Sequence, residues 1–315
     1  MKTALVTGSA GFVGRYMVRE LVSRGFIVDC VDIAGEHKFD LLKFLDYRRY
    51  TDPETYDLVV HCAYHVGGRA AIDGRNLNLA ANLQLDAALF EWAATTKQQR
   101  VLYFSSCAAY PVWLQRKDTV EDPLFQESDF SPSRLHEVDI DLDDISTPDA
   151  DYGWAKLTGE RLARSARKLG LAVTVVRPFS GYGEDQSLDY PFPSIIRRAS
   201  EGDLTVWGPP GQTRDWIHID DVVSGALAVV EAEYDGPVNL CTGRGVEMGE
   251  LAMMAWRGAG CPRAGWIDPY PQCDESKPTG VFYRVGDPTL MHEFYTPKIT
   301  LEEGIDRALK TGPCP

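Results

Sequence analysis

Residues 7–14 read Thr-Gly-Ser-Ala-Gly-Phe-Val-Gly and directly follow the apolar run Lys2–Val6. Glycines at this spacing permit a tight turn, let the backbone approach a pyrophosphate, and let the following helix pack closely on the strand. The free N–H groups and the dipole at a helix N-terminus favour an anion at the same place. The pattern therefore predicts a dinucleotide-binding turn, the alternative being a glycine-rich turn without a ligand. The predicted contacts are Gly8, Ala10, Gly11, Phe12, Val13 and Gly14.

Asp32 closes the next apolar run, Ile27–Asp32. A carboxylate at this strand end accepts hydrogen bonds from the adenosine ribose hydroxyls and repels a 2′-phosphate. No Arg lies between Ile33 and Phe39 to bind such a phosphate. The sequence therefore favours NAD over NADP as the cofactor, the alternative being a solvated acid at the end of a strand.

Short apolar runs alternate with helical patterns through the first half of the chain. Runs without internal alternation are typical of parallel strands that helices cover on both faces. Further strands are expected at Leu58–His61, Val101–Ser105 and Val173–Arg177, and helices at Gly11–Arg24, Asn78–Thr95 and Tyr152–Leu169. The predicted fold class is α/β, a Rossmann-type doubly wound parallel sheet.

The second half is less regular and is expected to form a smaller, interleaved C-terminal lobe that binds the substrate. We assign residues 1–177 to an NAD-binding domain, and residues 178–214 and 243–315 to the lobe. A helical pattern at Asp220–Glu231 indicates that residues 215–242 return to the first domain. Residues 112–151 hold three basic and twelve acidic residues, which predicts a solvated insertion.

The composition excludes several classes of protein. Lys and Arg total 32 against 46 Asp and Glu, a net charge of −14, which argues against a surface for nucleic acid but leaves room for one anionic ligand in a local basic pocket. No apolar run approaches the roughly 20 residues of a membrane span, and the N-terminus turns to glycine too early for a signal peptide. The seven cysteines form no CxxC pair, so we expect no metal site and a cytoplasmic protein.

Tyr152 and Lys156 lie one helical turn apart on one face of an expected helix. Free tyrosine has a pKa near 10, and a neighbouring ammonium group together with an oxidised nicotinamide lowers that pKa enough for proton transfer. Ser106 follows a strand at the carboxyl edge of the sheet, where ligands of open α/β sheets bind. The three residues are the candidate catalytic group. No nucleophile-elbow context surrounds Ser106 that would indicate a hydrolase.

Several motifs follow one another along nearly the whole chain in an order that resembles the extended short-chain dehydrogenase/reductase family of nucleotide-sugar epimerases, dehydratases and reductases. Beyond the glycine turn and Asp32, they are Asp40-Leu41, His61-Cys62-Ala63, Asn82, Ser105-Ser106, Tyr152 with Lys156, Arg177-Pro178, Tyr182-Gly183 and Arg214–Asp221.

The resemblance also implies roles for further residues. Asp40 and Leu41 would border the adenine, and Ala63, Asn82 and Pro178 would line the cofactor cleft. Cys107, Ser180 and Lys277 would join Ser106 around the substrate. Arg214 would clamp the diphosphate of a nucleotide sugar, the alternative being a salt bridge to Asp215 or Asp220. His61, Cys62 and His65 superficially resemble metal ligands, but a strand end in this family needs no metal.

Four departures from the family pattern narrow the expected reaction. Dehydratases carry an Asp-Glu pair after the catalytic hydroxyl, where this chain has Cys107-Ala108, so dehydration is disfavoured. Some segments resemble GDP-fucose synthase and GDP-mannose 3,5-epimerase. Those enzymes use a Cys where this chain has Ala108, and an additional His whose nearest equivalent is Tyr190. Ser180 replaces the usual Asn. The separation between Ser106 and Tyr152 is also long. The segments with this resemblance are Val66–Gly68, Tyr110-Pro111, Val206–Gly208 and Lys277–Gly280.

What remains is the chemistry that Ser106, Tyr152, Lys156 and NAD perform unaided. The C4 hydroxyl of a nucleotide-diphosphate sugar loses a proton and a hydride, the 4-keto sugar turns over, and hydride returns to its other face. The expected function is therefore an NAD-dependent nucleotide-sugar 4-epimerase. The alternatives are a 4-ketoreductase similar to GDP-fucose synthase and a non-catalytic dinucleotide-binding protein. In the family, helices equivalent to Asn82–Thr95 and Tyr152–Leu169 form a four-helix bundle, so a homodimer is expected.

Overall fold

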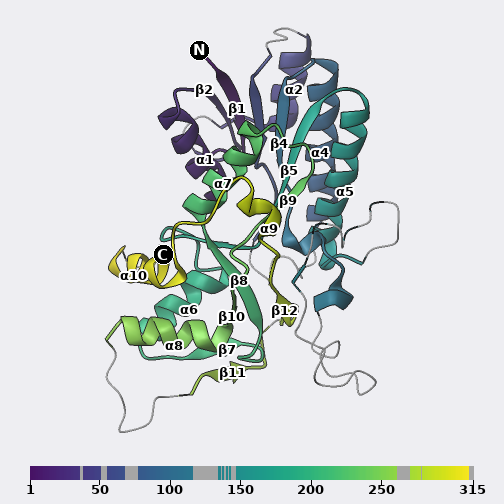
Figure 1. Ribbon diagram of the computed structural model, residues 1–315. Coiled ribbons are helices and arrows are strands. Elements are labelled where there is room, and N and C mark those ends of the chain that lie inside the picture. The colour runs from purple at the N-terminus through teal and green to yellow at the C-terminus, as the bar shows by residue number, and fades with distance from the viewer. Residues whose placement is uncertain are drawn as a thin grey trace.

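The computed structural model describes residues 1–35, 38–50, 55–67, 77–115, 134–135, 137, 140, 142, 147–260, 270–277 and 279–311. Its centre is a six-stranded sheet in the order β2-β1-β3-β4-β5-β9, and every neighbouring pair is parallel (Figure 1). The strands are β1 (Thr3–Thr7), β2 (Ile27–Val31), β3 (Leu58–His61), β4 (Arg100–Phe104), β5 (Ala172–Pro178) and β9 (Pro237–Leu240).

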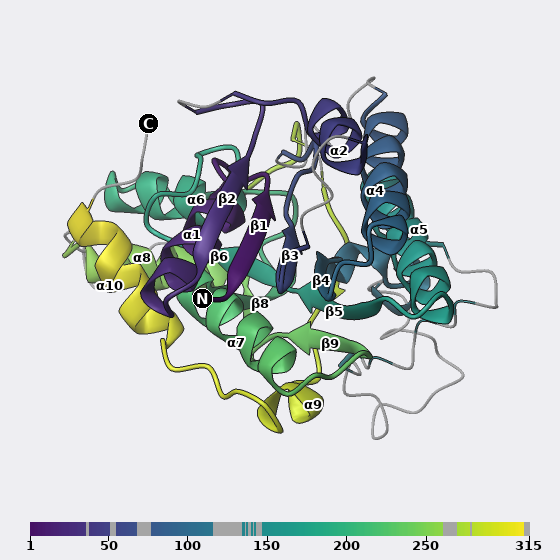
Figure 2. The same cartoon turned by 90° about the horizontal axis from the view of Figure 1, so that it is seen from above.

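Helices cover both faces of this sheet (Figure 2). One face is covered by α1 (Phe12–Ser23) and α7 (Ile219–Glu231), and the other by α2 (Leu41–Tyr50), α4 (Asn78–Thr95) and α5 (Ala150–Lys168). Successive strand residues therefore enter different apolar cores: Ala4 and Val6 pack towards α1 and α7, whereas Leu5 packs towards α4. The doubly wound α/β fold predicted from the sequence is confirmed, and burial on both faces explains why the strand runs are uniformly apolar.

The smaller lobe is built around a second sheet with the order β10-β8-β12, in which β6 also pairs with β8. Three helices cover it and share an apolar core that includes Phe192, Trp216 and Leu251. The strands are β6 (Ser180–Tyr182), β8 (Thr213–His218), β10 (Gly245–Glu247) and β12 (Tyr283–Arg284), a separate pair is β7 (Thr205–Trp207) with β11 (Gln272–Asp274), and the helices are α6 (Pro191–Ser200), α8 (Met248–Gly258) and α10 (Leu301–Thr311).

Two parts of the expected division differ in detail. Within residues 215–242, α7 and β9 pack into the large sheet, but residues 215–218 belong to β8 of the small sheet. Most of residues 112–151 lies outside the described residues. Leu135 and Ile140, which belong to the segment expected to be solvated, are instead buried in an apolar cluster with Tyr110 and Phe179. Their apolar side chains outweigh the acidic composition around them.

Candidate active site

A cavity of about 1040 Å³ opens at the carboxyl ends of the large sheet and extends to the smaller lobe. The chain passes from β2 back across β1 to β3, so β1 and β3 enclose the point where the direction of winding reverses, and such points hold ligands in open α/β sheets. The cavity brings together most of the residues expected in the site. Those that line it are Gly8, Ala10, Gly11, Phe12, Val13, Gly14, Asp32, Asp40, Leu41, Ala63, Ser106, Tyr152, Lys156, Pro178, Ser180 and Arg214.

The glycine turn between β1 and α1 has no room for side chains at two positions. Gly8 has a φ of +68°, and a Cβ there would come within 2.5 Å of the Ala63 backbone nitrogen. A Cβ at Gly14 would overlap the Gly8 carbonyl oxygen. Gly11 starts α1 without a side-chain cap, which leaves the first N–H groups of the helix available to an anion. This cradle fits the pyrophosphate of a dinucleotide.

Asp32 lies just beyond β2 and fixes the same turn. One carboxylate oxygen accepts the Ala10 N–H at 2.9 Å, and the other accepts the Ala34 N–H at 2.8 Å. Asp32 also lines the cavity, so it combines a structural role with the one expected towards a ribose. Asp40 accepts the Leu42 N–H at 2.9 Å and shapes the start of α2 at the far end of the cavity.

Ser106, Tyr152 and Lys156 meet where β4 ends and α5 begins. Ser106 Oγ accepts the Ala108 N–H at 3.1 Å, and Ser106 and Tyr152 both line the cavity. Lys156 Nζ donates to the Phe104 carbonyl oxygen at 2.7 Å. Gly153 faces the Ala108 carbonyl, and a Cβ there would overlap that oxygen, so the first turn of α5 approaches the residues after β4 closely.

Burial shifts the pKa of both ionisable residues in opposite directions. Burial raises the pKa of Tyr152 above its usual value, and nearby Tyr190 raises it further, while the neighbouring Ser106 side chain lowers it. Burial lowers the pKa of Lys156 to about 8, and the charge of Asp86 opposes this shift. Tyr152 therefore depends on neighbouring positive charge to release its proton, and Lys156 is the cation on the next turn of the same helix.

Three expected site residues are not among the residues that line the cavity. Asn82 is buried and holds the segment after β3, because its amide exchanges hydrogen bonds with the backbone of His65 at 2.7 and 3.1 Å. Cys107 is buried in an apolar cluster, with its Sγ 4.0 Å from Arg284 Nη1. Lys277 is exposed and lies over the Trp207 ring.

The end of the cavity towards the smaller lobe lies between β6, β8 and α6. Arg214 on β8 lines it and donates to the Thr213 carbonyl at 2.8 Å. Asp215, considered above as a partner of Arg214, accepts bonds from Thr242 and from the Gly243 and Gly286 N–H groups. Sequence reasoning did not assign several further lining residues, because only the tertiary fold brings them to the cavity. These are Tyr64, Phe179, Gln186, Trp216 and Met248.

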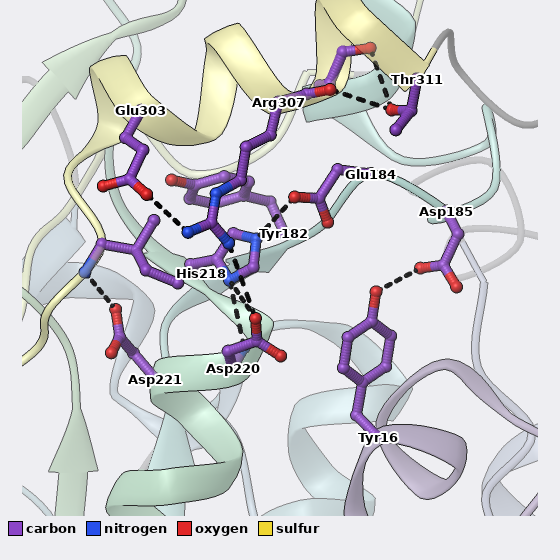
Figure 3. A network of polar contacts seen from close by, with 12 residues as sticks. Tyr16, Tyr182, Glu184, Asp185, His218, Asp220, Asp221, Glu303, Arg307 and Thr311 are labelled. Atoms are coloured by element: carbon purple, nitrogen blue, oxygen red, sulfur yellow. Dashed lines mark hydrogen bonds and ion pairs between the residues drawn. The ribbon is translucent and has the colours of Figure 1, made fainter. Parts of the chain in front are cut away.

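The segment after β6 carries Asp185 and Gln186 on the cavity wall, and polar contacts fix it (Figure 3). Asp185 accepts the Tyr16 hydroxyl of α1 at 2.8 Å and pairs with Arg15. His218 lies between Glu184 and Asp220, and Arg307 of α10 lies 3.8 Å from Asp220. The wall is thus tied to both α1 and α10.

Within the described ranges no group of three His, Cys, Asp or Glu side chains is placed to hold a metal ion. His61 instead bonds to Thr7 at 2.7 Å and to Asp86 at 3.0 Å. In the same part of the chain, no helix is both long and apolar enough to cross a bilayer.

The comparisons with known proteins agree with this geometry. The chain is 28% identical to the dTDP-4-dehydro-6-deoxy-D-allose reductase of Streptomyces bikiniensis, over 93% of this chain and 90% of that one. It is 27% identical to a probable GDP-L-fucose synthase of Oryza sativa subsp. japonica, over 97% and 90%. The structure of Thermotoga maritima UDP-glucose 4-epimerase with UDP-glucose superposes with a TM-score of 0.78 at 22% identity, covering 98% of each chain.

The model of one family, described as the NAD dependent epimerase/dehydratase family, matches residues 4–241. The match begins in β1 and ends just after β9, so it spans the glycine turn, Ser106, Tyr152 and Lys156. The resemblance inferred from the motifs is confirmed, and the chain belongs to the NAD-dependent epimerase/dehydratase family.

Proposed function

We propose that this enzyme is an NAD-dependent nucleotide-sugar 4-epimerase. One observation carries the proposal: Ser106, Tyr152 and Lys156 converge at the cavity that also contains the glycine turn and Asp32. Carbon-acid epimerisation is less well supported, because Ala108 stands where the 3,5-epimerases use a Cys, and the neighbouring Cys107 is not among the residues that line this cavity. Proton transfer at a sugar hydroxyl is therefore the chemistry that the described residues support best.

Tyr152 is the proton-transferring group in this proposal. It removes the C4 hydroxyl proton of the sugar, Ser106 holds the same oxygen, and the Lys156 ammonium offsets the charge on the phenolate. A bound nicotinamide supplies the uptake and return of hydride at C4. Arg214 is the candidate contact for the substrate diphosphate, since this cationic residue lines the end of the cavity towards the smaller lobe.

We propose NAD rather than NADP as the cofactor. Both carboxylate oxygens of Asp32 accept backbone N–H bonds, which holds the acid at the cavity. A 2′-phosphate would meet this carboxylate, whereas the free ribose hydroxyls can donate to it. The 4-epimerase cycle regenerates its cofactor, so a site selective for NAD suits it.

The decisive experiment incubates the purified protein with a panel of UDP-, GDP- and dTDP-hexoses without added reductant. Interconversion of two C4 epimers, followed by nuclear magnetic resonance, is the expected result. A matched set containing 4-keto sugars and NADH tests reduction. Stoichiometric oxidation of NADH, with no interconversion in the first set, would replace the epimerase assignment.

A 4-ketoreductase is the second candidate, favoured by the relatives named as reductases and fucose synthase. It would use Tyr152 as a proton donor to a 4-keto sugar, in half of the epimerase cycle. The two candidates share the site residues and differ in whether an external reductant is consumed.

We also propose a homodimer formed through α4 and α5. These helices lie side by side on one face of the sheet (Figure 2). Along α4, Asp86 and Glu91 are the only charged residues, and Asp86 is fully buried. Trp154 on α5 is 43% exposed in the single chain, and an isologous helix pair would cover such a face.

A further inference from the structure

Tyr64 lies three residues after the end of β3 and lines the cavity, but neither the motifs nor the proposed reaction gives it a role. The centre of its ring lies only 3.2 Å from Lys156 Nζ. The same ring lies edge-on to Tyr152, with the two centroids 6.0 Å apart and the planes at 87°. Tyr64 therefore contacts both members of the candidate proton-transfer pair.

A hydrogen bond to a buried acid holds the Tyr64 ring in place. Its hydroxyl donates to Asp86 Oδ2 at 3.0 Å, and Asp86 on α4 has no exposed surface. Asp86 also accepts the Tyr103 hydroxyl at 2.8 Å and bonds to His61 Nε2 at 3.0 Å. The Asp86 carboxylate is therefore hydrogen-bonded to side chains from β3, β4 and the segment after β3. These bonds fix the position of the Tyr64 ring.

This arrangement limits where the Lys156 ammonium can point. An ammonium group has three N–H bonds. One goes to the Phe104 carbonyl, and the face of Tyr64 takes up another side of the nitrogen. A cation over an aromatic face is stabilised, most strongly away from water.

We propose that Tyr64, held by Asp86, is a positioning residue that fixes the Lys156 ammonium beside Tyr152 and keeps it charged. The inference rests on the proposed roles of Tyr152 and Lys156. Without the aromatic face, Lys156 keeps its bond to Phe104 but is free to turn, and its charged form loses a stabilising contact.

Several groups act on the charge of Lys156. Burial lowers its pKa to about 8, and the acids that oppose this are Asp86 from α4 and Glu160 from α5, together with the Cys62 thiol after β3. The rings of Tyr103 and Tyr152 face it at 5.2 and 5.8 Å. Loss of a contact that favours the cation lowers the pKa further, so Tyr64→Leu is expected to move it down by about one unit.

The test titrates Lys156 directly in the full-length protein without sugar or turnover. The extent of acetylation of Lys156 by acetic anhydride is measured by mass spectrometry between pH 6 and 10. A midpoint near 8 is expected for the wild type, and one lower by about a unit for Tyr64→Leu. Tyr64→Phe keeps the ring but loses the bond to Asp86, so its midpoint is expected between these two. Tyr270→Leu, at an exposed tyrosine, is the matched control and should titrate as the wild type does.

Midpoints for both Tyr64 variants equal to that of the wild type would overturn the proposal. If Tyr64→Leu fails to fold, Tyr64→Phe alone tests the proposal, and an unshifted acetylation midpoint for that variant overturns the proposal. In turnover, the alkaline limb of the kcat profile should move down with the midpoint, a change that mere loss of packing would not produce. Because the amine titration needs no substrate, its outcome does not depend on which nucleotide sugar the enzyme uses.

Discussion

Tyr152 is the residue on which the proposed proton transfer depends. Tyr152→Phe removes only the hydroxyl at the cavity and leaves the ring in place. General acid–base catalysis is worth about 10²–10⁴-fold, so turnover is expected to fall by at least about 100-fold while cofactor binding persists. Steady-state kinetics and calorimetric titration with NAD measure the two effects. A variant that retains a tenth of the wild-type rate would mean that another base operates.

Asp32 sets the expected choice of cofactor. A 2′-phosphate about 4 Å from its carboxylate costs on the order of 1–4 kcal/mol near a protein surface. At 1.4 kcal/mol per decade, this gives a preference for NAD of about ten- to several-hundred-fold. Asp32→Asn should reduce this preference for NAD, because the amide keeps an oxygen acceptor without the negative charge. Calorimetry with both cofactors gives the ratio, and Asp46→Asn on the exposed side of α2 is the control. Equal affinity of the wild type for the two cofactors would contradict the assignment.

At the scale of elements, Asp215 joins three parts of the smaller lobe. From β8 it accepts the Thr242 N–H and hydroxyl at 2.8 and 2.6 Å, the Gly243 N–H at 2.9 Å and the Gly286 N–H at 3.3 Å. Asp215→Asn would turn an amide N–H₂ towards these donors and is expected to reduce the free energy of unfolding by about 1–3 kcal/mol. Urea unfolding measures this, with Asp306→Asn as the control because that side chain on α10 is 62% exposed. Identical midpoints for Asp215→Asn and wild type would show that the carboxylate does not hold the lobe together.

The same scale shows what the sequence could predict. The helix Asn78–Thr95 was predicted with both of its ends, and β3 likewise, because local apolar patterns specify them. The strands of the smaller lobe were not predicted. β10 and β12 contain three and two residues, and their partner β8 is remote in sequence, so no local pattern marks them. Tyr64 was missed for a related reason: its partners Asp86 and Lys156 come from helices that only the tertiary fold brings beside β3.

For the whole molecule, the outward surface of α4 provides the test of assembly. Ala80 and Ala87 are exposed there on a helix whose only exposed charge is Glu91. We expect two chains of 35.0 kDa to sediment together at micromolar concentration. Ala87→Arg should shift the protein towards the monomer, whereas the same change at exposed Ala232, beyond α7, should not. A wild-type chain that sediments as a monomer would contradict the dimer.

The order of the strands in the large sheet also bears on how the protein is made. A nascent chain that has emerged as far as β5 holds five of the six strands, but α7 and β9 follow only at residues 219–240. Until then, Val6, Val60 and Leu102 lack much of the cover that α7 gives them in the finished protein. Such exposed apolar surface is prone to aggregation during synthesis. The ribosome must therefore deliver about three quarters of the polypeptide before its first half can be safely buried.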